Sequence, residues 1–130
     1  MKKVAQKKRT DCGVACVAMV AGVGYGAAYT ALGEASQRRT HVADLRKALA
    51  RFEIGLGHHS VPVSPEKLPD LPFDCLLKTR PGPKSKNFHW MVWSSQLKKI
   101  IDPLPDGKAY KNPAKRVSAY IQVKRPEKHE

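Results

Sequence analysis

The chain has 130 residues, of which 42% are hydrophobic and 27% are charged. This composition excludes a disordered chain and supplies one domain with a single core. No apolar run approaches the roughly 20 residues that cross a bilayer, and the residues after Met1-Lys2-Lys3 are too polar for the apolar part of a signal peptide. We therefore expect a cytoplasmic protein without a transmembrane segment. It should form one domain over residues 1–130, with a basic N-terminal arm at 1–9 and a charged tail at 125–130.

The net charge of +13 comes from 24 Lys and Arg residues against 11 Asp and Glu residues. Such an excess attracts nucleic acid, anionic membranes or acidic peptides. The basic residues are spread along the chain rather than gathered in one stretch. Nucleic acid is therefore a less favoured partner than a peptide or protein substrate.

The first half of the sequence predicts three helices. Residues 12–21 are apolar almost all round, which is typical of a buried central helix, and Asp11 stands at its N-cap position. A weaker helix is expected over 27–35. A third helix, with Thr40 as its cap, is predicted by four apolar residues at helical spacing: Val42, Leu45, Leu49 and Phe52.

The second half predicts an antiparallel sheet. Four prolines between residues 62 and 72 exclude a long helix there. Strands are expected at 73–79, 88–94, 97–101 and 117–123, with the middle two forming a hairpin. A run of helices followed by a run of strands is typical of the α+β class.

The chain has three cysteines, Cys12, Cys16 and Cys75, which cannot all pair, and we expect them to be reduced. Cys12 opens the first predicted helix, where unpaired backbone N–H groups and the positive end of the helix dipole favour a thiolate. It is therefore the candidate nucleophile, and a small buried residue is the alternative. Cys16, one turn later, is expected to be buried behind it.

Three further residues complete the set that acyl transfer through a thioester needs. His89 can act as general base and then general acid, and Asp102, in the neighbouring predicted strand, can orient its imidazole. Gln6 precedes Cys12 by six positions and can place a side-chain N–H beside the Cys12 backbone N–H, forming an oxyanion hole. Gly13 is expected to leave room for a substrate carbonyl. The alternatives are that Asp102 caps the following turn and that Gln6 is a solvated residue of the basic arm.

These residues and their spacing resemble the signature of the C39 family of bacteriocin-processing, double-glycine cysteine peptidases. Residues 6–16 are similar to its Q-x4/5-D-C-G-x-A-C pattern, residues 89–92 to its H-[FWY]-x-V strand, and Asp102-Pro103 to its D-P. The resemblance covers roughly residues 4–124. It implies a papain-like fold, with an N-terminal helical lobe packed on a C-terminal antiparallel sheet. It also implies cleavage of a leader peptide after a Gly-Gly type sequence, and we expect a free-standing relative of the family's exporter-linked domains.

Two other functions are open. A thioester accepts amines as well as water, so the same residues could run an acyltransferase or transglutaminase-like reaction. Alternatively, the protein could be a catalytically inactive papain-like module that binds nucleic acid or an acidic protein through its basic surface. No metal or cofactor is expected, because His58 and His59 are adjacent and no Cys or carboxylate lies at ligand spacing. The basic stretch from Lys78 to Lys86 precedes His89 and predicts a preference for acidic residues in the substrate.

Overall fold

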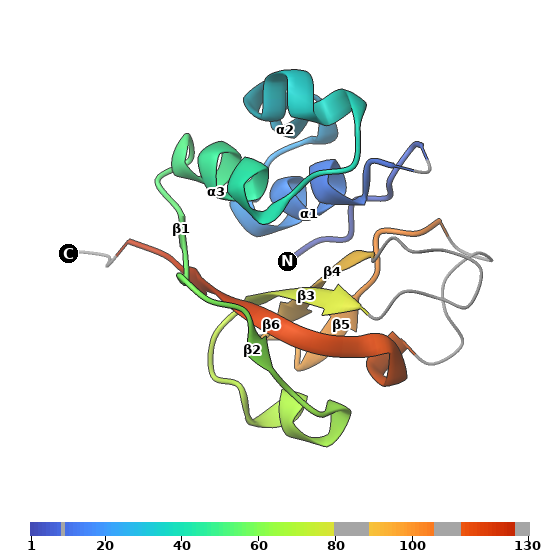
Figure 1. Ribbon diagram of the computed structural model, residues 1–130, viewed down its shortest axis with the longest axis vertical. Coiled ribbons are helices and arrows are strands. Elements are labelled where there is room, and N and C mark those ends of the chain that lie inside the picture. Colours follow the sequence, from blue (N-terminus) through green and yellow to red (C-terminus); the bar gives the residue numbers. More distant parts are fainter. Residues whose placement is uncertain (9, 80–88, 106–112, 127–130) are drawn as a thin grey trace.

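The computed structural model describes residues 1–8, 10–79, 89–105 and 113–126. In these residues three helices precede an antiparallel sheet, and Figure 1 shows the helices gathered on one side of it. The helices are α1 (Cys12–Ala21), α2 (Tyr25–Leu32) and α3 (Val42–Ala50), with short 3-10 helices η1 (Gly33–Gln37), η2 (Pro65–Asp70) and η3 (Pro113–Arg116). The strands are β1 (Gly55–Leu56), β2 (Val61–Pro62), β3 (Cys75–Thr79), β4 (Trp90–Ser94), β5 (Lys99–Ile101) and β6 (Val117–Lys124). The predicted α+β class, with a helical N-terminal lobe packed on an antiparallel sheet, is confirmed.

The sheet has the strand order β1-β6-β3-β4-β5, and β2 also pairs with β6. Every pairing between these strands is antiparallel. The predicted hairpin is present, because β4 pairs with β5 with Val92 opposite Ile101. Strand alternation separates two apolar clusters: Trp90 and Val92 join the one that includes the helices, whereas Met91 and Trp93 join the one on the other face.

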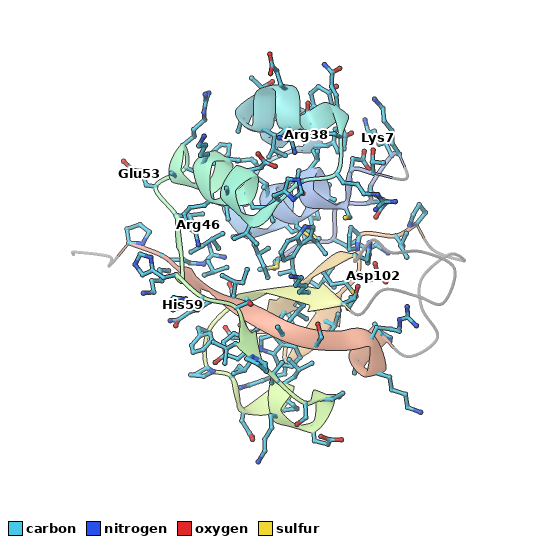
Figure 2. The ribbon with its side chains drawn as sticks, viewed as in Figure 1. Lys7, Arg38, Arg46, Glu53, His59 and Asp102 are labelled. Atoms are coloured by element: carbon cyan, nitrogen blue, oxygen red, sulfur yellow. The ribbon has the colours of Figure 1, made fainter. Side chains whose placement is uncertain are left out.

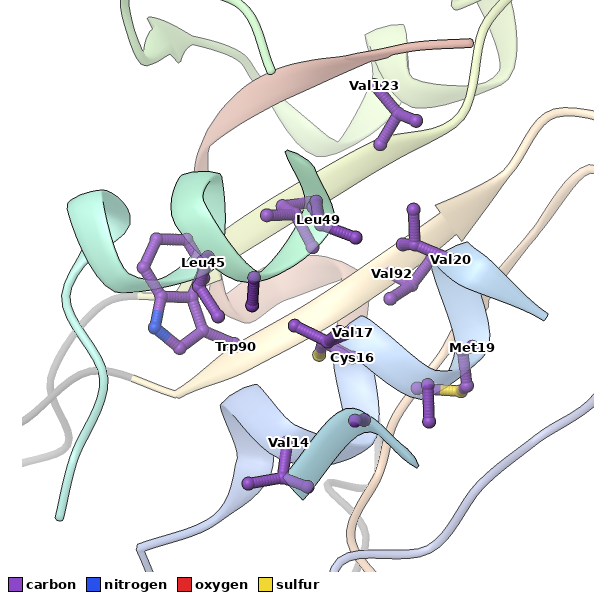
Figure 3. Close-up of a cluster of buried hydrophobic side chains, with 14 of the residues drawn as sticks. Val14, Cys16, Val17, Met19, Val20, Leu45, Leu49, Trp90, Val92 and Val123 are labelled. Carbon is purple, nitrogen blue, oxygen red and sulfur yellow. The ribbon is translucent and has the colours of Figure 1, made fainter. Parts of the chain in front are cut away.

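The main core lies between the helices and the sheet, and Figure 3 shows it in close-up. Helix α1 runs through its centre, and the residues from Cys12 to Val20 are all buried. Its apolar character on every side is therefore explained by burial within the fold. Gly22 ends the helix in the left-handed region, with a φ of 70°. No single helix of the described chain is long and apolar enough to cross a membrane, and α1 meets that test only together with Tyr25–Gln37, at a bend of 113°.

Several predicted boundaries shift. Helix α2 begins at Tyr25 and ends at Leu32, so the last part of the expected 27–35 helix is the 3-10 helix η1. Thr40 does not cap α3. The helix begins after His41, whose backbone N–H donates to the Asp44 carboxylate at 2.8 Å, while Thr40 is buried. The short strands β1 and β2 were not predicted, because two residues carry no periodicity. Most of the expected basic loop, including Lys84 and Lys86, lies outside the described residues.

The two ends of the chain are attached to the fold more firmly than the sequence predicts. Met1 and Val4 pack against the main core, so the first residues are not a free arm. At the other end, the Arg125 guanidinium donates to the Val20 carbonyl and to the Asp74 carboxylate, each at 2.8 Å. Arg125 is therefore not frayed, and residues 127–130 of the expected tail lie outside the described part of the chain.

Candidate active site

Cys12 and His89 meet where α1 packs on β4. Cys12 is the first residue of α1 and is 4% exposed, and His89 immediately precedes β4. Helix α1 packs against β4, which brings the thiol and the imidazole together although they are far apart in the sequence. His89 interacts with the side chains of both Cys12 and Asp102.

Asp102 follows β5, the strand beside β4 (Figure 2 labels its position). Its Oδ1 lies 2.8 Å from His89 Nε2 and also accepts the Leu104 backbone N–H at 3.0 Å. The side chain therefore contacts the imidazole and caps the turn that follows it, so the two interpretations of Asp102 are compatible. Because Nε2 faces Asp102, Nδ1 is the ring nitrogen left to face the thiol.

The surroundings of His89 favour its protonated form. Burial alone would lower the imidazole pKa, but hydrogen bonds to Asp102 and Cys12, together with their negative charges, more than offset it. The net effect raises the pKa of His89 from 6.5 to about 9. At neutral pH the ring therefore carries its proton.

The backbone of His89 is fixed by Thr79, the last residue of β3. The His89 N–H donates to Thr79 Oγ1 at 2.8 Å, and the Thr79 N–H donates to the His89 carbonyl at 3.1 Å. Sequence reasoning missed this partner, because a threonine in a strand has no local feature that marks such a contact.

Gln6 is buried rather than solvated, at 6% exposure. Its Nε2 donates to the Lys8 carbonyl at 2.8 Å, and its backbone N–H donates to the Pro103 carbonyl at 2.7 Å. Gln6 therefore lies next to the segment that carries Asp102. The Lys8 contact uses one of the two N–H groups of the side-chain amide.

Asp11 occupies the N-cap position of α1, but its side chain makes no capping hydrogen bond to the helix. Its carboxylate instead accepts the backbone N–H groups of Lys7 and Lys8, at 3.1 and 3.0 Å, and the Tyr25 hydroxyl at 2.6 Å. Asp11 is therefore at the predicted N-cap position, but its side chain bonds the preceding loop and Tyr25 and does not bond the helix. As a consequence, the Asp11 carboxylate does not occupy the N–H groups of the first turn of α1.

The structure shows a packing reason for the absence of a side chain at Gly13. A Cβ at this position would lie far inside the van der Waals radius of Thr40 Oγ1 and 3.0 Å from the Thr40 Cβ and Cγ2. The glycine therefore permits close packing of α1 against the segment before α3. Room for a substrate carbonyl is not needed to explain it.

The other two thiols are buried and free. Burial, assisted by the nearby charges of Cys12 and Asp102, raises the pKa of Cys16 well above its usual range. Burial and the Asp74 charge raise the pKa of Cys75 to about 12. Neither thiol is suited to act as a nucleophile near neutral pH. Within the described residues, no cluster of three His, Cys, Asp or Glu side chains could hold a metal ion.

A helical lobe with a cysteine at the N-terminus of its central helix, packed on an antiparallel sheet, is the architecture of the papain-like cysteine peptidases. Residues 1–115 match the model of the Peptidase C39 family, and the chain belongs to this family.

One solved structure with the same fold is the crystal structure of the peptidase domain of Streptococcus ComA, a bi-functional ABC transporter involved in a quorum sensing pathway. The two chains are 22% identical, with a TM-score of 0.64 over 96% of this chain and 98% of that chain. At this identity the likeness shows the fold. A search of curated proteins found no match.

Proposed function

We propose that this protein is a peptidase that cleaves its substrate through a Cys12–His89–Asp102 triad, with Gln6 in the oxyanion hole. The observation that carries the proposal is the position of the His89 ring, which interacts with Cys12 and lies 2.8 Å from Asp102. The proposed nucleophile is the Cys12 thiolate, and His89 lies beside it with its proton held at neutral pH. That pair needs no further activation before attack.

The reaction follows from these roles. The Cys12 thiolate attacks the peptide carbonyl carbon, and the negative charge that develops on the carbonyl oxygen is bound by the Cys12 backbone N–H and by the second side-chain N–H of Gln6. His89 then gives its proton to the leaving amine as the C–N bond breaks, which leaves a thioester on Cys12. His89 next takes a proton from water, whose oxygen attacks the thioester, and the acid product leaves with the thiolate restored.

The substrate that we propose is a peptide cut after a Gly-Gly type sequence, as the family resemblance implies. Two exposed lysines, Lys7 and Lys8, adjoin Gln6 in the loop before α1 and favour acidic residues in the peptide. A peptide with the two glycines replaced by leucines should be cleaved far more slowly. Equal rates for the two peptides would contradict the Gly-Gly proposal without affecting the triad.

The triad is tested by labelling with iodoacetamide at pH 6, with the labelled residue assigned by mass spectrometry. Cys12 should react much faster than a free thiol, whose pKa is about 8.5, and His89→Ala should slow it. Cys16 and Cys75 are internal controls in the same molecule, because both have raised pKa values. If Cys12 reacts no faster than these two thiols and is indifferent to His89→Ala, the proposed peptidase mechanism is wrong.

Hydrolysis and acyl transfer are separated by the product. Peptide cleavage is carried out with and without an added primary amine, and the mass of the N-terminal fragment is measured by mass spectrometry. We expect the free acid in both reactions. An amide of the added amine as the main product would instead identify an acyltransferase.

A further inference from the structure

We propose that Asp11 and Tyr25 are positioning residues that hold Gln6 in place for the oxyanion hole. This inference rests on the proposed role of Gln6 and goes beyond it, because it assigns a role to two residues that act through Gln6. Tyr25 lies on α2, whose other residues have no part in the proposed mechanism. Gln6, Lys7, Lys8 and Asp11 lie in the loop before α1, and hydrogen bonds connect them to Tyr25.

An unbroken series of hydrogen bonds joins Tyr25 to Gln6. The Tyr25 hydroxyl donates to Asp11 Oδ2 at 2.6 Å, and Asp11 Oδ1 accepts the Lys8 N–H at 3.0 Å. The Lys8 carbonyl in turn accepts the Gln6 side-chain amide at 2.8 Å. A second bond, from the Lys7 N–H to Asp11 Oδ2 at 3.1 Å, fixes the residue between them.

The burial of Asp11 and its choice of partners indicate that its carboxylate orders the loop before α1 and does not cap the helix. Asp11 is 0% exposed, and a buried carboxylate is costly unless its oxygens are hydrogen-bonded. The side chain of an N-cap residue usually accepts a hydrogen bond from a backbone N–H in the first turn of its own helix. The Asp11 carboxylate makes no bond to the N–H groups of that turn and accepts N–H groups of the loop instead. The carboxylate therefore orders the loop that carries Gln6.

Tyr25 is a suitable anchor for the carboxylate. Burial, together with the hydrogen bond to Asp11, raises its pKa well above the usual range, so the hydroxyl remains a donor at any working pH. The loop also rests on the tyrosine rings of α2: Lys7 Nζ lies 4.5 Å from the centre of the Tyr25 ring, and Lys8 Nζ lies 5.9 Å from that of Tyr29. Loss of the Tyr25 hydroxyl should therefore release the loop at one end.

The experiment compares two reactions of the same thiol. Acylation of Cys12 by a p-nitrophenyl ester passes through an oxyanion, whereas alkylation by iodoacetamide does not. Both rates are measured at pH 7 for the wild type, Tyr25→Phe, Gln6→Ala and the double variant. Tyr29→Phe is the matched control, because it removes the same group from the next turn of α2 without touching the Asp11 carboxylate.

We expect Tyr25→Phe to slow acylation by about tenfold or more and to leave alkylation unchanged. Gln6→Ala should slow acylation by about 100-fold to 1000-fold, as the loss of an oxyanion donor does. The double variant should be no slower than Gln6→Ala alone, because both changes act through the same amide. Tyr29→Phe should match the wild type in both reactions.

Three other results would overturn the inference. If Gln6→Ala slows acylation and Tyr25→Phe does not, the positioning role is wrong and the proposed function stands. If neither variant slows acylation, the oxyanion role of Gln6 is wrong and the inference fails with it. If Tyr25→Phe slows acylation and alkylation equally, the hydroxyl supports the Cys12–His89 pair or the fold, and not Gln6.

Discussion

Replacing Asp102 by Asn should change how the stability of the protein depends on pH. The interactions of His89 raise its pKa from 6.5 to about 9, which corresponds to about 3 kcal/mol at about 1.4 kcal/mol per pH unit. A raised pKa means that the fold binds the proton more tightly than the unfolded chain does. The stabilisation is therefore fully present below pH 6.5 and is lost as the pH rises through about 9.

Asp102→Asn keeps the size of the side chain and removes its charge, so the His89 pKa should fall. The variant should be less stable than the wild type at pH 6, by less than about 3 kcal/mol because Cys12 also contributes. This difference should shrink towards pH 10. The free energy of unfolding is measured by urea denaturation between pH 6 and 10, with the fluorescence of Trp90 and Trp93, both buried, as the signal.

The control for this series is Asp74→Asn. Asp74 is held by Arg125 and Ser95, and its pKa is lowered, so it does not titrate in this range. Its effect on stability should be the same at every pH of the series. A difference between Asp102→Asn and the wild type that is equally independent of pH would refute the argument that Asp102 acts on the His89 proton.

Two further predictions follow from the same contacts. The kcat/KM for peptide cleavage should fall above about pH 9, because His89 then loses the proton that the leaving amine needs; a rate that stays level to pH 11 would contradict its role as the general acid. Arg125→Ala should destabilise the protein by about 1 kcal/mol, a value reduced by the partial exposure of the side chain. Because Arg125 binds the far end of α1 from Cys12, iodoacetamide labelling of Cys12 should not change, and slower labelling would show that the two ends of the helix are coupled.

The elements that depend on residues close together in the sequence were predictable. Helix α1 has the expected bounds, because an acidic residue, an apolar run and a glycine mark its start, its burial and its end. The hairpin of β4 and β5 was predicted from alternation and a short turn, and it brings His89 and Asp102 to neighbouring strand ends. A pairing between adjacent strands needs only short-range information.

Contacts between segments far apart in the sequence were not predictable. The partner of Asp11 is Tyr25, 14 residues later, and the carbonyl at the end of α1 is bonded by Arg125, 105 residues later. In the same way, the Gln6 backbone N–H donates to the Pro103 carbonyl, which lies far away in the sequence. A basic segment such as 1–9 is typical of a solvated arm, and only the packing of Met1 and Val4 on the main core and the burial of Gln6 show that its described residues are attached to the fold.

The packing of Gly13 on Thr40 gives a further prediction, because it joins the two halves of the site. Gly13 adjoins Cys12, and the Thr40 carbonyl accepts the indole N–H of Trp90, which adjoins His89.

Gly13→Ala should gain up to about 1 kcal/mol in helix propensity. It should lose more from the clash, because overpacking a buried site costs about 1–3 kcal/mol and α1 is enclosed on all sides.

The clash can be tested with a matched pair of second changes. Thr40→Ala removes the oxygen that the new methyl would meet and should restore part of the stability of Gly13→Ala in urea denaturation. Thr40→Ser keeps that oxygen and should restore much less. Equal rescue by the two would mean that the cost of Gly13→Ala does not arise at Thr40 Oγ1, and wild-type stability of Gly13→Ala alone would mean that the helix can move away. If Gly13→Ala alone has wild-type stability, the contact between Gly13 and Thr40 does not fix the distance between Cys12 and His89.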